Sequence, residues 1–330
     1  MSLVKRLLLL LLVVMFVAVS WLAYRFIARP TIAPYLSLAL PAAPVNFSGL
    51  HVTFLGVASL LLDDGETAIL TDGFFSRPPG REVFLGKIAP DRDVIAQSLD
   101  RAGIHKLAAV ITLHSHYDHV LDSPEVAKRT GALLVGSVST ANVGRGWGLA
   151  EDRMHVMRDG EVLHFGRFEV TVIKSAHFPH GLAMGEIDAP LRTPAHANDY
   201  REGGSYQLLV RNGGHSLLIN GSAGFVEGVL AGRQAEVVFL GIGGMGGKDD
   251  AYRSAYWRQA IQSVNAKRVI PIHWDDFTLP LDQPLVPMRL LFDDMNKSME
   301  FLLQRGRIDK VDVRLAMPWV IVDPFEGLSP

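Results

Sequence analysis

Cysteine is absent from the 330-residue sequence. Its absence excludes disulfide bonds, thiolate metal ligands and a cysteine nucleophile. Any metal ion must therefore be held by histidine, aspartate, glutamate or backbone oxygen. An excess of basic charge is also missing, because 32 Lys and Arg residues face 34 Asp and Glu residues, for a formal net charge of −2. The balance argues against a nucleic-acid binder that relies on a net-positive surface, and no nucleic-acid partner is expected.

The overall composition is that of a globular protein. Hydrophobic residues make up 48% of the chain and charged residues 20%. These values exclude a disordered chain, a collagen and a polytopic membrane protein. The length allows one large domain or two smaller ones. The sequence leaves the oligomeric state open.

An apolar run at residues 7–24 follows Lys5 and Arg6 and precedes Arg25 and Arg29. A helix of that length spans roughly 27 Å, close to the ~30 Å hydrocarbon core of a bilayer. We expect residues 1–29 to form a single membrane anchor. The basic residues at the start favour a cytoplasmic N-terminus, which places the rest of the chain outside the cytoplasm.

A cleaved signal sequence is the alternative for this segment. Such sequences have a shorter apolar stretch, of about 7–15 residues, that ends in small residues such as Ala18-Val19-Ser20. Here the apolar run continues past that site through Trp21, Leu22 and Tyr24, which favours the anchor. With cleavage the protein would be secreted or periplasmic.

Four prolines at positions 30, 34, 41 and 44 predict a linker over residues 30–46. One folded domain is expected from about Phe47 to the end, over residues 47–330. Within it, apolar runs predict strands at residues 51–55, 59–62, 67–71, 108–113, 132–135, 168–174, 206–210, 216–219, 236–240 and 268–272. Stacked sheets covered by helices would accommodate these elements.

The helices expected in this domain cover residues 91–102, 124–130, 249–264 and 286–304. Ser123 is placed to cap the second of them, ahead of Pro124. In the last, four apolar residues recur at helical spacing and predict core packing: Met288, Leu291, Met295 and Met299. Residues 181–205 are rich in glycine and proline and predict a long loop of the kind that is often functional.

Three of the twelve histidines fall within six residues, in the segment His114-Ser115-His116-Tyr117-Asp118-His119. The segment directly follows the apolar strand expected at 108–113. Neutral imidazole and carboxylate are the ligands that Zn²⁺ takes when cysteine is absent, and close spacing at a strand end brings them together at little cost in chain entropy. Solvated histidines on a loop are the structural alternative.

This H-x-H-x-D-H pattern resembles the signature of the metallo-β-lactamase-fold hydrolases, and further similarity extends over roughly residues 49 to 275. The resemblance implies an α/β fold, a four-layer αββα sandwich of the metallo-β-lactamase type, here preceded by one N-terminal transmembrane helix. Residues 56–62 and 71–78 resemble the subgroup that contains ascorbate-phosphate lactonases and N-acyl-phosphatidylethanolamine phospholipases D.

The resemblance also implies a set of site residues. One metal ion would be bound by His114, His116 and His177, and a second by Asp118, His119 and His273. Asp72 looks like the acidic residue that orients a ligand histidine from behind. As alternatives, His180 competes with His177 for its role, His273 can be a core histidine, and Asp72 can cap a turn with Gly73.

One position departs from the family pattern. The family usually places an aspartate that bridges both metals in a turn after a strand, and Ser222 stands at that position in Ile219-Asn220-Gly221-Ser222. A neutral hydroxyl supplies no bridging negative charge. We therefore expect a weaker second metal site or a single metal, unless Asp275, Asp276 or Asn220 compensates.

Residues 241–246 also match the dinucleotide-binding pattern G-x-G-x-x-G. The pattern occurs late in the chain without a second βαβ unit, and the next strand ends in His273, which the metal site already uses. We interpret the segment as a backbone loop that passes close to the active site, and expect no organic cofactor.

The predicted function is therefore metal-dependent hydrolysis by a metal-activated hydroxide, with one or two Zn²⁺ or other divalent transition-metal ions per chain. Asp118 would orient the water or pass its proton to the leaving group. A small-molecule or lipid substrate is expected, with a phosphodiester or ester bond. The alternatives are a lactonase or sugar-phosphate hydrolase and, from another class, a non-catalytic metal-binding module weakened by Ser222.

Overall fold

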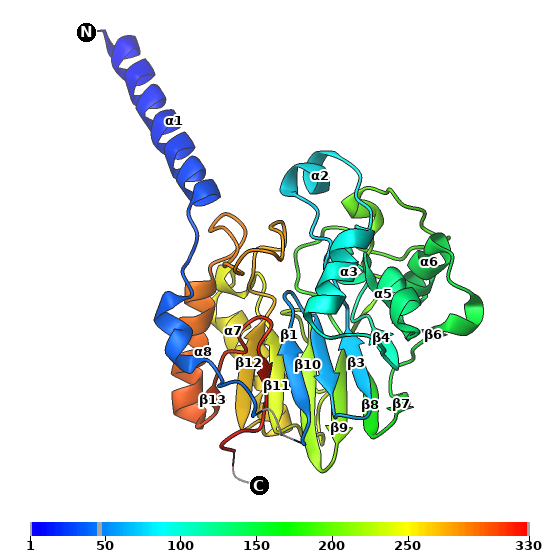
Figure 1. Cartoon of the computed structure of the whole chain (residues 1–330). Helices are drawn as coiled ribbons and strands as arrows, with labels where there is room; N and C mark the ends of the chain where they lie inside the picture. The colour runs from blue at the N-terminus through cyan, green and yellow to red at the C-terminus, as the bar shows by residue number, and fades with distance from the viewer. Residues whose placement is uncertain (1, 45–47, 329–330) are drawn as a thin grey trace.

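Two stacked sheets form the core of the protein, and helices lie on either side of them (Figure 1). The structure, a computed structural model, describes residues 2–44 and 48–328, so the expected domain start at Phe47 lies outside it. Over the described residues both sheets have seven strands. Helices α3, α5 and α6 lie on one side of the sandwich and α7 and α8 on the other (Figure 1). The predicted αββα architecture is confirmed.

The first sheet has the strand order β14-β1-β2-β3-β4-β5-β6. Its strands are β1 (His51–Phe54), β2 (Leu60–Asp63), β3 (Ala68–Thr71), β4 (Ala109–Ile111), β5 (Leu133–Gly136), β6 (Met154–Val156) and β14 (Ile321–Val322). From β14 to β3 the neighbours are antiparallel, and from β3 to β6 they are parallel.

The second sheet has the order β13-β12-β11-β10-β9-β8-β7. Its strands are β7 (Val162–Phe165), β8 (Phe168–Ser175), β9 (Ser205–Asn212), β10 (His215–Asn220), β11 (Val237–Gly241), β12 (Arg268–Ile272) and β13 (Asp312–Val313). It repeats the plan of the first sheet, because β7 to β10 are antiparallel and β10 to β13 are parallel.

The helices are α1 (Leu3–Ile27), α2 (Gly80–Leu85), α3 (Arg92–Arg101), α4 (Tyr117–Val120), α5 (Ser123–Thr130), α6 (Val138–Trp147), α7 (Asp250–Ala260) and α8 (Met295–Asp309). Short 3-10 helices cover Ala33–Leu38, Glu151–Arg153, Ala197–Asp199, Met245–Gly247 and Gln262–Val264. Each strand predicted from the sequence overlaps an observed one, whereas β6, β7, β13 and β14 were not predicted.

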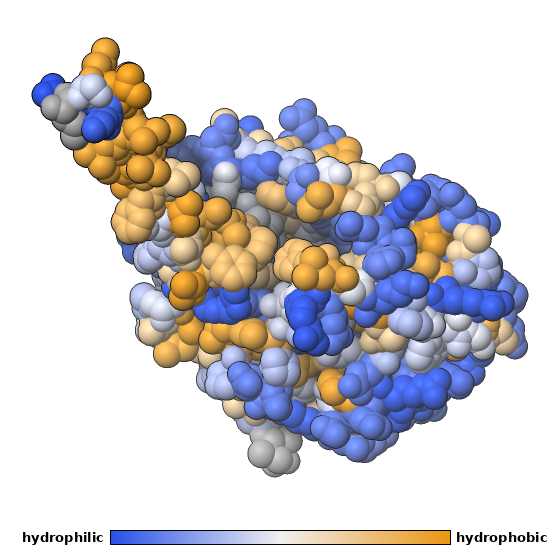
Figure 2. Space-filling view, turned by 90° about the horizontal axis from the view of Figure 1, so that it is seen from above, coloured by the Kyte–Doolittle hydropathy of each residue, from blue (hydrophilic) through white to orange (hydrophobic). Residues whose placement is uncertain are grey.

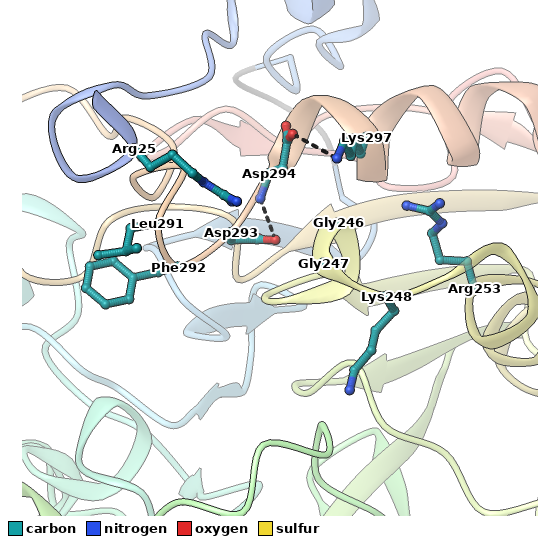
Figure 3. A pocket seen from close by; sticks show the side chains of 10 residues that line it. All are labelled: Arg25, Gly246, Gly247, Lys248, Arg253, Leu291, Phe292, Asp293, Asp294 and Lys297. Carbon is teal, nitrogen blue, oxygen red and sulfur yellow. Dashed lines mark hydrogen bonds and ion pairs between the residues drawn. The ribbon is translucent and has the colours of Figure 1, made fainter. Parts of the chain in front are cut away.

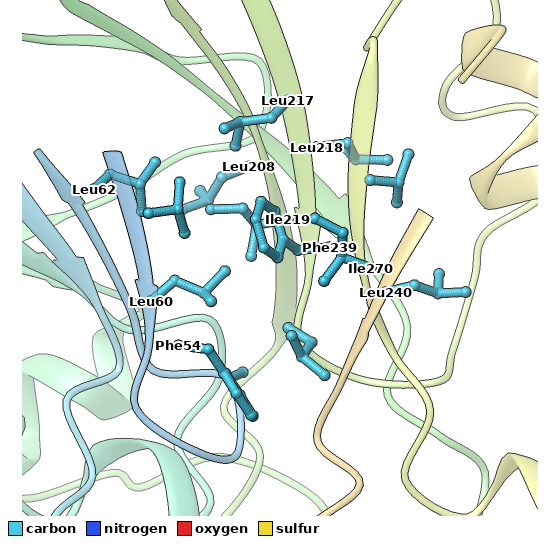
Figure 4. Packing of buried hydrophobic residues seen from close by; sticks show 14 of the residues in the cluster. Phe54, Leu60, Leu62, Leu208, Leu217, Leu218, Ile219, Phe239, Leu240 and Ile270 are labelled. Carbon is cyan, nitrogen blue, oxygen red and sulfur yellow. The ribbon is translucent and has the colours of Figure 1, made fainter. Parts of the chain in front are cut away.

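The core lies between the two sheets, where apolar side chains of both inner faces meet. Phe54, Leu60 and Leu62 project from the first sheet towards Ile219 and Phe239 of the second (Figure 4). All five side chains are fully buried. The alternation along each strand explains this packing, since every second side chain points to the same face.

Two helix predictions need correction. Ser123 does not cap α5, because Asp122 is the N-cap and the Ser123 hydroxyl donates instead to the carbonyl oxygens of Asp72 and His119. The helix predicted at 286–304 begins only at Met295. Pro287 has no N–H to donate and pairs in an isolated bridge with Asp275, so residues 286–294 form a loop.

Of the four apolar residues expected on that helix, Met295 and Met299 are buried in the core as predicted, whereas Met288 and Leu291 lie half-buried in the preceding loop. The long loop predicted at 181–205 is confirmed, with the 3-10 helix at Ala197–Asp199 as its regular part.

Helix α1 extends away from the domain (Figure 1). Among the described residues it is the one helix long and apolar enough to cross a membrane, and none of its apolar window is buried against the protein. Residues 33–43, expected to lie in a linker, run along the domain: Tyr35 and Leu40 are buried, and the Leu40 amide donates to the Leu315 carbonyl.

Asp64 connects the two sheets in the turn after β2. It accepts hydrogen bonds from the backbone amide of Thr67 at 2.8 Å and, from the second sheet, from Asn212 Nδ2 at 2.7 Å and Arg167 Nε at 3.1 Å. Burial opposes its ionisation, but these hydrogen bonds outweigh burial and lower the pKa of Asp64 from 3.8 to about 2.

We predict that Asp64→Ala lowers the free energy of unfolding of the full chain in detergent micelles by about 1–3 kcal/mol, because a carboxylate that bonds both sheets is lost. Glu66→Ala is the matched control, since that exposed carboxylate is 4.0 Å from the same arginine. Because the folded-state pKa is lowered, the contribution should be complete above the unfolded pKa of about 4 and decline as the pH falls towards 2. Denaturant unfolding followed by circular dichroism measures it, and equal effects of the two variants would contradict the prediction.

Candidate metal centre

The predicted ligands all follow strands whose carboxyl ends meet at one edge of the sandwich. Residues 114–119 follow β4, His177 follows β8 and His273 follows β12. In the second sheet, β9 is antiparallel to both of its neighbours, β8 and β10, and β10, β11 and β12 are parallel to one another. Strands β8, β10 and β12 therefore point the same way. Carboxyl ends of such strands are the usual place for a site in α/β folds.

The six side chains form two adjacent groups. His114, His116 and His177 make up one group, and Asp118, His119 and His273 the other. Within each group the possible ligand atoms lie within 4.8 Å of one another. The groups adjoin, because the ring centroids of His114 and His119 are 3.7 Å apart.

The second group has distances that suit one metal ion. His273 Nε2 lies 3.3 Å from Asp118 Oδ2 and 3.3 Å from His119 Nε2, and His119 Nε2 lies 3.7 Å from Asp118 Oδ2. Ligand atoms placed tetrahedrally about 2.0–2.2 Å from one Zn²⁺ are about 3.3–3.6 Å apart. Two of the three distances lie in this range and the third is 0.1 Å longer, so the donor set fits a metal ion with little rearrangement.

Hydrogen bonds outside the groups fix which ring nitrogen each histidine turns inward. His119 Nδ1 donates to Asp72 Oδ2 at 2.6 Å, His177 Nδ1 to the Phe178 carbonyl at 2.8 Å and His116 Nε2 to the Ala183 carbonyl at 3.2 Å. The opposite nitrogen of each ring is left with a lone pair for a ligand. His114 Nε2 is buried and has no hydrogen-bond partner among the described residues, so it too is free to bind a ligand.

Burial keeps the first group neutral. It lowers the pKa of His114 well below its usual range, that of His116 to about 4 and that of His177 to about 3, with the neighbouring histidines adding to the effect. Neutral imidazole is the form that binds a metal ion. In the second group burial also opposes charge, but His119 and a hydrogen bond from His273 hold the pKa of Asp118 below its usual range.

Asp72 lies behind the site, where the sequence places an orienting acid. Besides the bond from His119, its Oδ1 accepts from the backbone amide of Leu113 at 2.8 Å, and the side chain is completely buried. Both Asp72 and His273 have positive φ angles, of 53° and 57°. Such backbone conformations in residues other than glycine are uncommon and cluster at functional sites.

The residues expected to replace a bridging aspartate have other partners. Ser222 Oγ accepts from the Phe178 amide at 2.9 Å, and Asn220 Nδ2 donates to the Gly224 carbonyl. Asp275 forms a fully buried ion pair of 2.6 Å with Arg77 and accepts from the amide of Val57. Asp276 accepts from Arg29. The structure therefore brings neither Asp275 nor Asp276 into the two groups.

Two further segments cover the site. The ring centroid of His180 lies 4.6 Å from that of His177, and His180 Nδ1 accepts from the Leu182 amide, so His180 lies beside the first group. The 241–246 loop passes close to both Phe178 and His273. A Cβ on Gly243 would lie 2.8 Å from His273 Nδ1, which explains why glycine stands there.

A charged pocket that the sequence did not predict lies past the end of that loop. It is lined by ten residues: Arg25, Gly246, Gly247, Lys248, Arg253, Leu291, Phe292, Asp293, Asp294 and Lys297 (Figure 3). Four of them are basic and two acidic. They come from the end of α1, from the first residues of α7 and the segment before it, and from the first residues of α8 and the loop before it. Because these parts are far apart in the sequence, no local pattern connects them.

Comparison with known proteins gives concordant results. Residues 51–273 match the profile of the family described as "Beta-lactamase superfamily domain". A UPF0173 metal-dependent hydrolase of Heliobacterium modesticaldum is 26% identical over 269 residues, which cover 78% of this chain and 95% of the relative.

Two solved structures share the fold. Igni18, a metallo hydrolase from Ignicoccus hospitalis, has a TM-score of 0.51 at 16% identity, covering 83% of this chain and 97% of its own. A possible metal-dependent hydrolase from Veillonella parvula has a TM-score of 0.52 at 14% identity, covering 84% and 99%.

We predict that Asp72→Asn weakens metal binding by about 10- to 100-fold, because His119 loses the carboxylate that orients it while Leu113 keeps an acceptor. Isothermal titration of the metal-free full chain measures the affinity. Asp63→Asn is the control, since Asp63 accepts from Gly65 in a distant turn. Unchanged affinity in Asp72→Asn would refute the orienting role.

We predict that Gly243→Ala displaces His273 and removes the metal bound by the Asp118, His119 and His273 group. Gly247→Ala is the matched control from the same segment, because a Cβ there meets no atom within 4 Å. Elemental analysis of both variants against the parent gives the stoichiometry. Equal metal content in all three proteins would show that the loop does not constrain His273.

Proposed function

The chain belongs to the β-lactamase superfamily and is a metal-dependent hydrolase, and from this premise we propose that it cleaves phosphodiester or ester bonds, including those of lipid-derived substrates, at the two histidine and aspartate groups. One observation carries the proposal. The buried His114 Nε2 lacks a partner among the described residues, while His116, His119 and His177 each use one ring nitrogen outside their group. A buried nitrogen lone pair without a partner costs free energy, and an ion in the space that the free nitrogens face removes that cost.

We propose Zn²⁺ as the metal. The ligands are five imidazoles and one carboxylate with no sulfur, which suits Zn²⁺ among the available divalent ions, although Mn²⁺, Fe²⁺ and Co²⁺ also accept such a set. When bound, the ion activates water as a nucleophile and polarises the oxygen of the bond to be cleaved.

The protein's own residues position the reactants. Asp72 and the Phe178 and Ala183 carbonyls hold the histidine rings in one orientation. The side chains of Asp118 and His273 keep a small exposed fraction and His177 is half-buried, whereas His119 is fully buried, so substrate approaches past these three residues. Oδ2 of Asp118 faces His119 and His273, which leaves Oδ1 to orient a water molecule and to take its proton for the leaving group.

A cationic side chain beside the site supports a phosphodiester over a neutral ester. Lys248 Nζ donates to the Pro179 carbonyl at 3.1 Å and lies 4.6 Å from the centroid of the Phe178 ring. Both contacts are to the loop that carries His177 and His180. An ammonium group at this position would attract an anionic substrate and stabilise charge that develops on phosphoryl oxygens.

We further propose that α1 remains attached as a membrane anchor, with the domain outside the cytoplasm. A 25-residue helix with a long apolar run and no buried face is stable in a bilayer and not in water. Lys5 and Arg6 at its start favour a cytoplasmic N-terminus.

We predict two metal ions per chain in the full-length protein, one lost in His116→Ala and the other in His273→Ala. Because Ser222 supplies no bridging charge, the ion of the His273 group should be removed first by a chelator, and Ser222→Asp should delay its removal. Elemental analysis during chelator titration measures both effects. A protein that binds no transition metal at neutral pH would refute the proposed function.

The same preparations, loaded with Zn²⁺, test the substrate class. Bis(p-nitrophenyl) phosphate and p-nitrophenyl acetate report phosphodiester and ester hydrolysis, and a γ-lactone reports the lactonase alternative. We expect the phosphodiester rate to be the largest relative to the uncatalysed reaction, and both metal-site variants to abolish it. Preferential lactone hydrolysis would overturn the phosphodiester assignment and leave the hydrolase assignment intact.

A further inference from the structure

We propose that the end of the molecule at which the metal site opens lies against the lipid bilayer, so that substrate enters from the membrane. Five exposed apolar residues around the opening would contact the lipid, and we call them the rim: Phe84, Leu85, Leu182, Met184 and Phe292. For the identity of the substrate the proposal rests on the proposed function, whereas the contact between rim and bilayer stands independently of it.

Backbone hydrogen bonds join the end of the anchor to the loop that carries Phe292 of the rim. The Leu291 amide donates to the Arg25 carbonyl at 2.9 Å, and the Leu290 amide donates to the Ala28 carbonyl at 3.0 Å. Phe292, the next residue, therefore lies beside the last turn of α1. A bilayer that α1 crosses must begin close to this level of the domain.

Ion pairs and ring contacts add to the attachment. Arg29 Nη1 lies 2.5 Å from Asp276 Oδ2 and donates to the Pro287 carbonyl, and the Arg289 guanidinium lies 5.0 Å from the centroid of the Phe26 ring. These contacts tie the chain just after the apolar helix to the 276–289 segment. The domain is therefore held in one orientation relative to its anchor.

The rim is unusually apolar for a surface that faces water. Leu85 is 85% exposed, Leu182 67%, Phe84 65% and Phe292 47%, and the rings of Phe84 and Phe292 stack with centroids 6.0 Å apart. Seen from the end from which α1 emerges, apolar residues gather beside the foot of α1 and further across the same face (Figure 2). Clustered exposed apolar side chains of this kind mark binding surfaces for proteins or membranes.

The rim borders the metal site directly. His116 donates to the carbonyl of Ala183, which stands between Leu182 and Met184. On the opposite side, the ring of His273 is 5.7 Å from that of Phe277, and a Cβ on Gly80 would contact both Thr278 and Phe84 at 3.8 Å. A surface that covers the rim therefore covers the entrance to the site.

The charges at the foot of α1 favour a phospholipid surface over a protein. Arg25, Lys248, Arg253 and Lys297 line the pocket of Figure 3 with Asp293 and Asp294, so basic residues exceed acidic ones by two. Lys297 pairs with Asp294 and Arg253 with Asp250, whereas Arg253 Nε is buried without a hydrogen-bond partner among the described residues. Apolar residues flanked by such a basic pocket match the acyl chains and anionic phosphates of a bilayer. The rim would enter the acyl boundary while the pocket faces the headgroups.

The absence of cysteine makes the depth of each position measurable. Leu85→Cys and Leu182→Cys in the full chain, and Ile308→Cys as the control, each carry one spin label. Ile308 is 60% exposed and lies on α8, about 20 Å along the helix axis from the end next to the pocket. After reconstitution into phosphatidylcholine–phosphatidylglycerol vesicles, we expect the ratio of oxygen to aqueous-nickel accessibility to rise several-fold at positions 85 and 182 and to stay unchanged at 308.

Two results would overturn the proposal. Labels at 85 and 182 with the same accessibility ratio as the label at 308 would mean that the rim stays in water. Spin–spin broadening between copies at position 85, without a rise in oxygen accessibility, would mean that a second copy of the chain covers the rim.

An activity comparison then separates this proposal from the proposed function. Leu85→Asp should lower the rate on a vesicle-embedded phosphodiester several-fold relative to the rate on bis(p-nitrophenyl) phosphate, whereas Ile308→Asp should leave that ratio unchanged. An equal ratio in both variants would contradict entry from the bilayer. Failure of the zinc-loaded parent to cleave either substrate would contradict the hydrolase assignment, and the spin-label depths would still decide the position of the rim.

Discussion

The site depends on one constraint, which is that a buried polar atom must have a partner. Imidazole rings packed as closely as those of His114 and His119, with centroids 3.7 Å apart, would be unfavourable if their nitrogens were unpaired or charged alike. The protein resolves this by giving one nitrogen of His116, His119 and His177 an acceptor outside the cluster. The remaining ring nitrogens lie close enough together within each group to share a bound metal ion.

Much of this site was predictable from the sequence because its central part is local. Six consecutive residues after one buried strand contain four of the ligand-type side chains, so their convergence requires no long-range folding information. His177 and His273 were assigned by their order in a family pattern, and the fold explains that order, since β8 and β12 end at the same edge as β4. The two strained φ angles, at Asp72 and His273, have no signal in the sequence.

The predictions that failed were of a different kind, because they depend on contacts between residues that are not neighbours in the sequence. Asp275 follows a ligand closely enough to suggest a metal-bound carboxylate, yet Arg77, nearly two hundred residues earlier, neutralises it in a buried pair. The helical spacing from Met288 to Met299 is real, but Pro287 and its bridge to Asp275 hold the first part as a loop. The loop then carries Phe292 to the last turn of α1. In both cases a tertiary contact overrode what the local sequence suggested.

Helix α1 and the site are connected through the same segment of chain. Arg29, just beyond α1, pairs with Asp276, whose neighbour Asp275 pairs with Arg77 and accepts from the amide of Val57. The Val57 carbonyl in turn accepts from the amide of His273 at 2.7 Å and so supports the strained backbone of that residue. A simple tether would need none of these bonds. Because they form a continuous path from the end of the apolar helix to a candidate ligand position, the direction in which the site opens is fixed with respect to the helix. If α1 is the membrane anchor that we propose, the fold itself sets the orientation of the site at the membrane.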